Sequence, residues 1–271
     1  MAVCSTIVGA PLFIYGFRHA QQVELCELEL ELKGLPPLFD GYRLVQVSDL
    51  HSKGLGPREQ QVLKLLGGLQ ADVLALTGDY QYRNHTSANN LLPLLRQMAE
   101  IHDFPDGTVA IRGNHDRKEL HGLLKKQTFM RYLNDEVVLI KRGEQTLALC
   151  GLGYARQEHA RFLRSIRRLN SRIPPGVFKI LLCHSPDAFP LARESGYRLM
   201  LAGDTHGGQL RLPILGAVHK KTSLPQRFCR GLNQLAGAWC YTSSGIGTTG
   251  MPCRFNCPPE ITVFTLKAAR T

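Results

Sequence analysis

Short apolar stretches that each end in carboxylate, amide or imidazole residues recur five times along this chain of 271 residues. One of them is Val109–Ile111, which is typical of a buried strand and is followed by the sequence RGNHD over residues 112–116. A helix-like stretch begins directly afterwards. Since ligands of open α/β sheets bind at the carboxyl ends of strands, we expect residues 112–116 to lie at such an edge. A tight turn with an N-cap Asn or Asp would explain this stretch about as well if it stood alone.

In the other four stretches, an apolar strand is likewise followed by polar residues. Together the five stretches contain a set of possible ligands. These are Asp49 and His51, Asp79, Asn114 and His115, His184, and Asp204 and His206. All are oxygen or imidazole donors, which suit manganese, iron, magnesium or zinc. The set is too large for one ion, so it favours a two-metal site with a shared carboxylate. Any one of these histidines alone would more often be a hydrogen-bonded core residue.

The expected strands and helices indicate the fold class. Strands are expected over 23–33, 42–47, 72–76, 109–111, 137–141, 146–152, 178–183, 197–202, 240–243 and 261–266, and helices over 57–69, 88–101 and 158–169. Strands and helices alternate in the first half, and strands predominate in the second. This order predicts an α/β sandwich with two packed sheets.

The amino-terminal stretch Met1–Phe17 is apolar and uncharged, and it ends at Arg18. It is slightly short for a spanning helix, which needs about 20 residues, and it lacks the basic start of a signal peptide. Three alternatives remain for this stretch: a membrane anchor or its remnant, a monotopic or buried helix, or a signal sequence. We favour an anchor segment over 1–22 followed by one domain over 23–271. With no Lys or Arg before Arg18, the positive-inside bias puts this domain on the cytoplasmic side.

The charge of the chain favours anionic partners. Lys and Arg total 33 against 22 Asp and Glu, a net charge of +11, which suits a phosphate-bearing substrate, an acidic membrane or nucleic acid. Nucleic acid is the weakest of these, because the chain has a single Trp and no interleaving of aromatic and basic residues. Residues 156–172 form a basic amphipathic stretch that either lies on an anionic membrane or is an outer helix with a solvated basic face. The second alternative is favoured.

The motif order resembles that of a known family. Asp-x-His, Gly-Asp, Gly-Asn-His-Asp, His and Gly-x-Thr-His, spread over about residues 42–210, are similar to the motifs of the calcineurin-like metallophosphoesterases. The tail, with Gly245–Gly247, Pro252–Arg254 and Pro258–Thr262, is similar to the membrane-anchored bacterial branch of that superfamily. The resemblance implies a four-layer α-β-β-α sandwich of two mixed sheets and a dinuclear metal centre.

The resemblance also implies roles for single residues. Asp49, His51 and His206 would hold the first metal, Asp79 would bridge, and Asn114, His184 and Asp204 would hold the second. His115 would face the scissile phosphate instead of binding metal. Arg83 and Arg112 are candidates for phosphate contact, with a surface salt bridge or support of the site as an equal alternative.

Two positions depart from the family pattern. The family usually has His at the position of Asp204. A carboxylate there is a harder donor, which favours manganese, iron or magnesium over zinc. We therefore expect two divalent ions, manganese in the first place. Tyr82 lies at the spacing of a tyrosine ligand found in purple acid phosphatases, but those enzymes lack a His corresponding to His51, so we do not expect Tyr82 to bind metal.

The implied activity is phosphoryl transfer to water. Two cations would supply hydroxide at neutral pH, and His115 would protonate the leaving oxygen. Because the membrane-anchored branch includes UDP-diacylglucosamine pyrophosphatases of lipid A synthesis, we expect a nucleotide-linked lipid as substrate at the cytoplasmic face of a bacterial inner membrane. A broad phosphodiesterase or phosphomonoesterase is the alternative. A non-catalytic metal-binding interaction protein is a third possibility, against which the presence of His115 argues.

Overall fold

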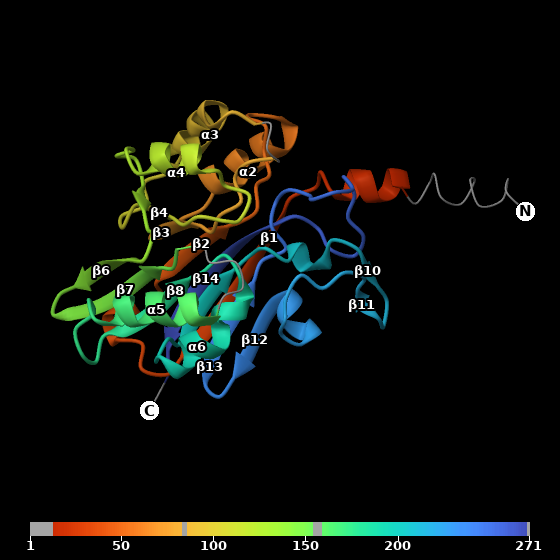
Figure 1. Ribbon diagram of the computed structural model, residues 1–271. Coiled ribbons are helices and arrows are strands. Elements are labelled where there is room, and N and C mark those ends of the chain that lie inside the picture. Colours follow the sequence, from red (N-terminus) through yellow and green to blue (C-terminus); the bar gives the residue numbers. More distant parts are fainter. Residues whose placement is uncertain (1–12, 83–85, 154–158, 270–271) are drawn as a thin grey trace, which may run out of the picture.

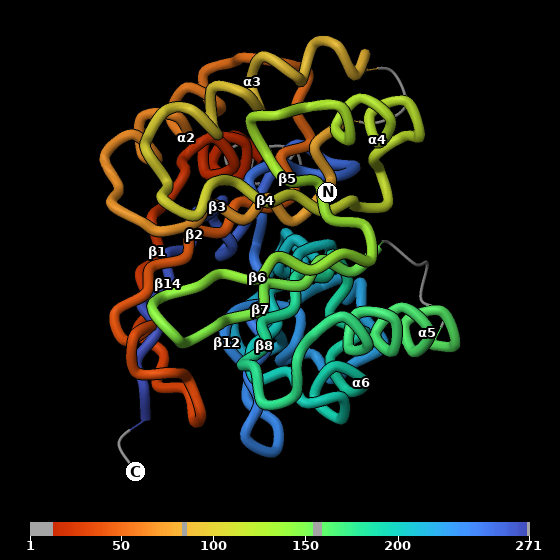
Figure 2. The backbone as a smooth tube through the Cα atoms, turned by 90° about the vertical axis from the view of Figure 1, so that its left-hand side faces the viewer, coloured from red at the N-terminus to blue at the C-terminus, as the bar shows by residue number. Residues whose placement is uncertain are grey.

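The computed structural model describes residues 13–82, 86–153 and 159–269. Two six-stranded mixed sheets pack face to face, and helices cover the outer face of each (Figure 1, Figure 2). The predicted sandwich of two mixed sheets is confirmed. Between residues 13 and 269, apart from the two gaps, no helix is both long and apolar enough to cross a bilayer.

The first sheet has the order β1-β14-β2-β3-β4-β5. Its strands are β1 (Glu24–Leu32), β14 (Glu260–Ala268), β2 (Arg43–Val47), β3 (Val73–Leu76), β4 (Thr108–Ala110) and β5 (Arg131–Tyr132). Strands β2 to β5 are parallel to one another, and β14 pairs antiparallel with β2. The outer face is covered by α2 (Pro57–Gly67), α3 (Ala88–Glu100) and α4 (Lys118–Leu124).

The second sheet has the order β12-β13-β9-β8-β7-β6. Its strands are β12 (Gly231–Leu235), β13 (Ala238–Thr242), β9 (Leu199–Ala202), β8 (Phe178–Leu182), β7 (Gln145–Gly151) and β6 (Glu136–Arg142). Strands β13, β9, β8 and β7 are parallel. Helices α5 (His159–Asn170) and α6 (Phe189–Glu194) cover its outer face, and β10 (Arg211–Leu212) and β11 (Gly216–Ala217) form a separate hairpin.

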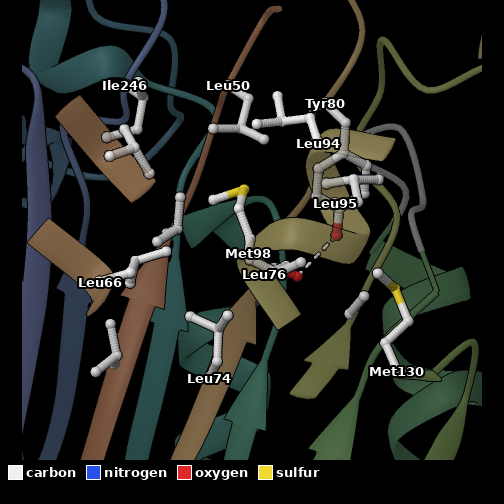
Figure 3. Packing of buried hydrophobic residues seen from close by; sticks show 14 of the residues in the cluster. Leu50, Leu66, Leu74, Leu76, Tyr80, Leu94, Leu95, Met98, Met130 and Ile246 are labelled. Carbon is white, nitrogen blue, oxygen red and sulfur yellow. Dashed lines mark hydrogen bonds between the residues drawn. The ribbon is translucent and has the colours of Figure 1, made fainter. Parts of the chain in front are cut away.

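The alternation of side chains along the strands creates three buried layers. In β3, Leu74 and Leu76 point toward α2 and α3, whereas Val73 and Ala75 point toward the second sheet. Figure 3 shows Leu74 and Leu76 beside Met98 of α3. Fully burying one such leucine stabilises the fold by about 1.5–3 kcal/mol. Because β3 is buried on both faces, it has an uninterrupted apolar sequence and not an alternating one.

Helix α5 contains much of the basic amphipathic stretch that the sequence singled out. Its apolar residues Phe162, Ile166 and Leu169 are buried against the second sheet and α6. The arginines of α5 lie around this buried stripe. The interpretation as an outer helix of the sandwich is therefore the correct one, and the apolar face of α5 is not available to a membrane.

The topology brings five loops to one edge of the molecule. Strands β2, β3 and β4 of the first sheet are parallel, as are β8 and β9 of the second. Their carboxyl ends precede residues 48–51, 77–79, 111–116, 183–185 and 203–206. These are the loops that carry all the predicted ligands.

A fully buried arginine, Arg254, holds a further loop behind this edge. Its guanidinium donates to four backbone carbonyls, those of Ser244, Gly245, Gly247 and Cys257. This loop pairs in turn with the loop after β2. Ile246 N donates to Ser48 O, and Gly247 N donates to Asp49 O. Arg254 thus supports the backbone on which the first predicted ligands lie.

We expect Arg254→Met to lower the free energy of unfolding by about 3 kcal/mol or more, because buried carbonyls would lose their donors. Urea unfolding followed by circular dichroism measures the change. Arg227→Met is the matched control, since Arg227 is exposed, and it should stay within about 0.5 kcal/mol of the wild type. Equal stability of the two variants would contradict this role of Arg254.

Candidate metal centre

All seven predicted metal ligands lie together between the carboxyl ends of the two sheets. Five are buried, with exposed fractions of 0–3%: Asp49, His51, Asp79, His184 and His206. Of the other two, Asn114 is exposed and the side chain of Asp204 is 18% exposed. The site is therefore closed on the protein side and open on the side of Asn114 and Asp204.

The first group of converging atoms comes from Asp49, His51 and His206, whose ligand atoms lie within 4.8 Å of one another. The Nε2 atoms of His51 and His206 are 3.1 Å apart. His206 Nε2 is 3.5 Å from Asp49 Oδ1. Because His51 follows β2 and His206 follows β9, the group joins the two sheets. These three side chains could hold one cation.

The second group consists of Asp49, Asp79 and His184. His184 Nε2 is 3.3 Å from Asp79 Oδ2, and the same carboxylate oxygen is 3.4 Å from His51 Nε2. Asp79 thus lies between histidines of both groups, which is the place required of a bridging carboxylate. Asp49 belongs to both groups as well, so it is a second candidate for the shared ligand.

Asn114 and Asp204 complete the second group on its open side. Asn114 Oδ1 lies 3.1 Å from His184 Nε2, and Asp204 Oδ1 lies 4.0 Å from the same nitrogen. The backbone N–H of Asp204 donates to Asp49 Oδ1 over 3.1 Å. The carboxylate that replaces the usual histidine is therefore within reach of an ion beside His184.

Backbone carbonyls orient two of the histidines. His51 Nδ1 is 3.2 Å from Gln81 O, and His184 Nδ1 is 2.8 Å from Thr77 O. A carbonyl only accepts, so Nδ1 donates in both residues and Nε2 faces the site. This arrangement of a histidine between a carbonyl and a metal position is typical of metal sites.

The ligand loops turn through left-handed backbone. The positive φ angles are 51° at Asp49, 39° at His51, 55° at Asp79, 68° at Asp204 and 52° at His206. L-residues adopt this region at a cost of roughly 1–2 kcal/mol each. Such strain clusters at functional sites, where the surrounding structure enforces it. The turn also lets the first and third residues of the Asp-x-His motif both face the site.

Asp116 supports the bridging position, a role that our sequence analysis did not assign. Its Oδ2 accepts from the N–H of Asp79 over 2.9 Å and of Gly113 over 2.8 Å. Its Oδ1 accepts from Tyr80 N over 2.8 Å. The clue was present, since Asp116 ends the RGNHD stretch, but only the fold shows that its carboxylate faces backbone N–H groups and not an ion.

Burial and mutual charge shift the pKa values of the site strongly. Burial raises the pKa of Asp49 to about 7 and lowers the pKa of His51 to about 4. Burial would lower the pKa of His184, but the carboxylates of Asp79, Asp49 and Asp204 together outweigh it and hold that pKa well above its usual range. Burial alone would raise the pKa of Asp79, but His184, His51 and His115 together outweigh it and lower that pKa.

The donor set fits divalent metal ions. Carboxylate oxygens and imidazole nitrogens converge from loops of both sheets, and at least His51 and His184 have Nε2 directed into the site. A divalent ion would bind these carboxylates and imidazoles in their deprotonated forms.

His115 lies beside the ligands without belonging to either group. Its Nε2 is 4.0 Å from Asp79 Oδ2, and its side chain is 37% exposed. Its backbone N–H donates to Asp79 Oδ1 over 2.7 Å. The ring packs edge-on against His51, with 5.0 Å between the centroids. His115 is therefore tied to Asp79 by its backbone, and its side chain is open to solvent.

The structure describes Arg112 but not Arg83, the two residues predicted to contact phosphate. Arg112 Nε donates to Asp116 O over 3.0 Å, so at least this nitrogen supports the backbone of the site. Arg83 lies outside the described residues. Tyr82 has Lys53 Nζ 4.7 Å above the centre of its ring.

Comparisons with known proteins agree with this geometry. The sequence profile of the family described as calcineurin-like phosphoesterase matches residues 42–208. An uncharacterized metallophosphoesterase of Bacillus subtilis, YkuE, is 30% identical over 94% of this chain and 90% of its own. The phosphodiesterase YaeI of Escherichia coli is 27% identical over 83% of this chain and 82% of its own.

A solved structure with a similar fold is that of Yfce, a phosphoesterase from Escherichia coli. It has a TM-score of 0.36 and 15% identity, over 75% of this chain and 80% of that chain. The weight of the comparison rests on the sequence matches, which span the whole ligand set. The chain belongs to the calcineurin-like phosphoesterase family, and it is a metal-dependent hydrolase of phosphate-containing substrates.

Proposed function

We propose that this hydrolase cleaves a phosphodiester or phosphoanhydride bond, with His115 as its general acid. The observation that carries the proposal is the position of His115, tied to Asp79 by its backbone and exposed on the open side of the site. A general acid must reach the leaving oxygen of a substrate held at the metal centre. The relative whose name states an activity, YaeI, is a phosphodiesterase.

The roles of the side chains follow from their places. Asp49, His51 and His206 would hold one divalent ion, Asn114, His184 and Asp204 the other, and Asp79 would lie between them. When bound, two divalent ions activate water for attack and neutralise charge on the phosphoryl oxygens. His115 would donate its proton to the oxygen that leaves phosphorus. Asp116 and Arg112 would keep the backbone of the loop in place.

A cavity beside the site suits a substrate with a large second group. Its volume is ≈ 620 Å³, and its lining includes His51, Lys53, Leu55, Tyr82 and Pro252. His51 connects it to the metal centre, Lys53 supplies a cation, and Leu55 and Pro252 supply apolar surface. A nucleotide-linked lipid pyrophosphate, such as UDP-diacylglucosamine, would use both kinds of lining. This substrate is the second candidate, beside a broad phosphodiesterase or phosphomonoesterase activity.

We further propose that the enzyme works at a membrane surface, on the cytoplasmic side of a bacterial inner membrane. The sequence supports this through the apolar segment 1–22 and the net charge of +11. Residues 1–12 of that segment lie outside the described part of the chain, and residues 13–19 are helical. An acidic membrane would attract a protein of this charge.

Metal add-back on two substrates tests the reaction class. We expect metal-free protein to be inactive and manganese to restore hydrolysis more fully than magnesium, iron or zinc. Release of UMP from UDP-diacylglucosamine, measured by chromatography, would support the lipid pyrophosphatase. Activity on bis-p-nitrophenyl phosphate alone would support the broad phosphodiesterase. No hydrolysis of either substrate by metal-loaded protein would contradict both.

Two variants separate metal binding from proton transfer. His115→Ala should keep its metal and lose about 10²–10⁴ in kcat, because the general acid is gone. Asp79→Ala should lose both metal and activity, because the bridging ligand is gone. Metal content by mass spectrometry and diester hydrolysis measure the two effects.

The matched control is His159→Ala, since His159 is exposed on α5, outside the site. It should match the wild type in metal content and rate. Full activity of the His115 variant would overturn its assignment as the acid.

Asp204→His tests the position that departs from the family. We expect this variant to keep diester hydrolysis and to shift its preference from manganese toward zinc, because imidazole is the softer donor. Activity titrations with each metal measure the shift. An unchanged preference would argue that Asp204 does not bind the second ion.

A further inference from the structure

The hairpin formed by β10 and β11 exposes an unusual amount of apolar surface. Leu212, Ile214, Leu215 and Val218 are 46%, 107%, 72% and 61% exposed. The side chains of Ile214, Leu215 and Val218 have larger exposed fractions than any other large apolar residue in the described ranges. The hairpin belongs to neither main sheet. Exposed apolar patches of this kind mark protein or membrane contacts.

The backbone at the tip of the hairpin strengthens this observation. Ile214 has a φ of +67°, a left-handed conformation that is a genuine outlier for a β-branched residue. Gly or Asn would relieve the strain and remove apolar surface from water. Neither folding nor solubility therefore explains an isoleucine at this position.

A second apolar surface lies beside the hairpin. In the helical residues 13–19, the side chains of Phe13, Ile14, Tyr15 and Phe17 are 48%, 52%, 49% and 45% exposed. Figure 1 shows this helix, in red, projecting on the same side of the molecule as β10 and β11. We call the four hairpin residues and these four helical residues the apolar face.

One segment joins the two parts of the apolar face. Phe255 O accepts from Arg211 N of the hairpin over 3.0 Å. The ring of Phe255 meets the ring of Tyr15, with 5.9 Å between the centroids. Next to it, Arg254 N donates to Gly16 O over 2.9 Å. The hairpin and the helix are thus fixed to the same short stretch of chain.

Cations outnumber acidic residues in the chain segments that form the apolar face. The sequence has no Asp or Glu before Glu24 and none between Asp204 and Glu260. Arg211, Lys220 and Lys221 donate instead to uncharged oxygens, those of Gly207, Leu224 and Thr249. None of the ion pairs among the described residues involves these three cations.

We propose that the apolar face docks the enzyme on a bilayer that contains anionic lipids. The aliphatic tip and the aromatic helix would enter the headgroup region, while Arg211 and Lys220 would face lipid phosphates. A second copy of this chain is the poorer occupant, because it would place cations against cations. The charge complementarity is with an anionic surface.

The docked orientation also bears on the substrate. The hairpin is attached to the loop of His206, since Arg211 Nη1 donates to Gly207 O over 2.8 Å. The metal centre would then lie close to the lipid surface. Resting on the proposed phosphoester hydrolysis, this favours a lipid phosphoester as substrate.

Vesicle flotation tests the docking. The full-length protein should bind vesicles of equimolar phosphatidylcholine and phosphatidylglycerol, and bind pure phosphatidylcholine vesicles much less. The double variant I214N/L215S should weaken binding by about tenfold or more, since the tip no longer enters the interface. The matched control is L38S/L235S, because Leu38 and Leu235 are also exposed (56% and 37%) but lie outside the apolar face.

Hydrolysis of bis-p-nitrophenyl phosphate, measured on the same preparations, should be equal in all three proteins. Vesicle binding by metal-loaded protein that hydrolyses neither the diester nor UDP-diacylglucosamine would leave the docking in place and remove the proposed function. No binding by the wild type, or equal binding by I214N/L215S, would overturn the docking. A dimer that only I214N/L215S dissociates, with vesicle binding unchanged, would overturn it in favour of a self-interface.

Discussion

The left-handed backbone at the ligands is the constraint on which the site depends. Five of the seven predicted ligands adopt it, and each would relax if its loop were free. The loops are held by one another: Asp49 N donates to Gly78 O, and His51 N donates to Asp79 O. The ligands that follow β2 are thus aligned by the loop after β3.

Close packing behind the loops keeps them in this conformation. Gly245 has a φ of +69°, and a Cβ there would collide with Asp49. Arg254 holds the same loop through its carbonyls, and it is fully buried. The site is therefore built on an inflexible base, with its carboxylates and imidazoles forced together. A divalent cation bound there would neutralise the negative charge of the neighbouring carboxylates.

The order of elements was largely predictable because buried parallel strands have continuous apolar sequences that end in polar loops. The hairpin β10–β11, strand β12 and helix α6 were not predicted. The two strands of the hairpin are two residues each, and α6 has six residues with Pro at its start. The hairpin strands and α6 are too short to show periodicity, and β12 has the sequence GLNQL without a continuous apolar run. Contacts with the rest of the fold therefore decide these elements.

The sequence by itself determined the chemistry of the donors, their order along the chain and their place after strands. It did so because ligand identity and strand periodicity are local properties. The tertiary structure alone decided that Asp116 faces N–H groups and that the apolar stripe of α5 is buried. It also decided that the hairpin β10–β11 and the helical residues 13–19 meet at Phe255. These outcomes depend on how segments far apart in the sequence pair with one another. Strand β14, for example, pairs with β1 and β2, and no local sequence pattern specifies this pairing.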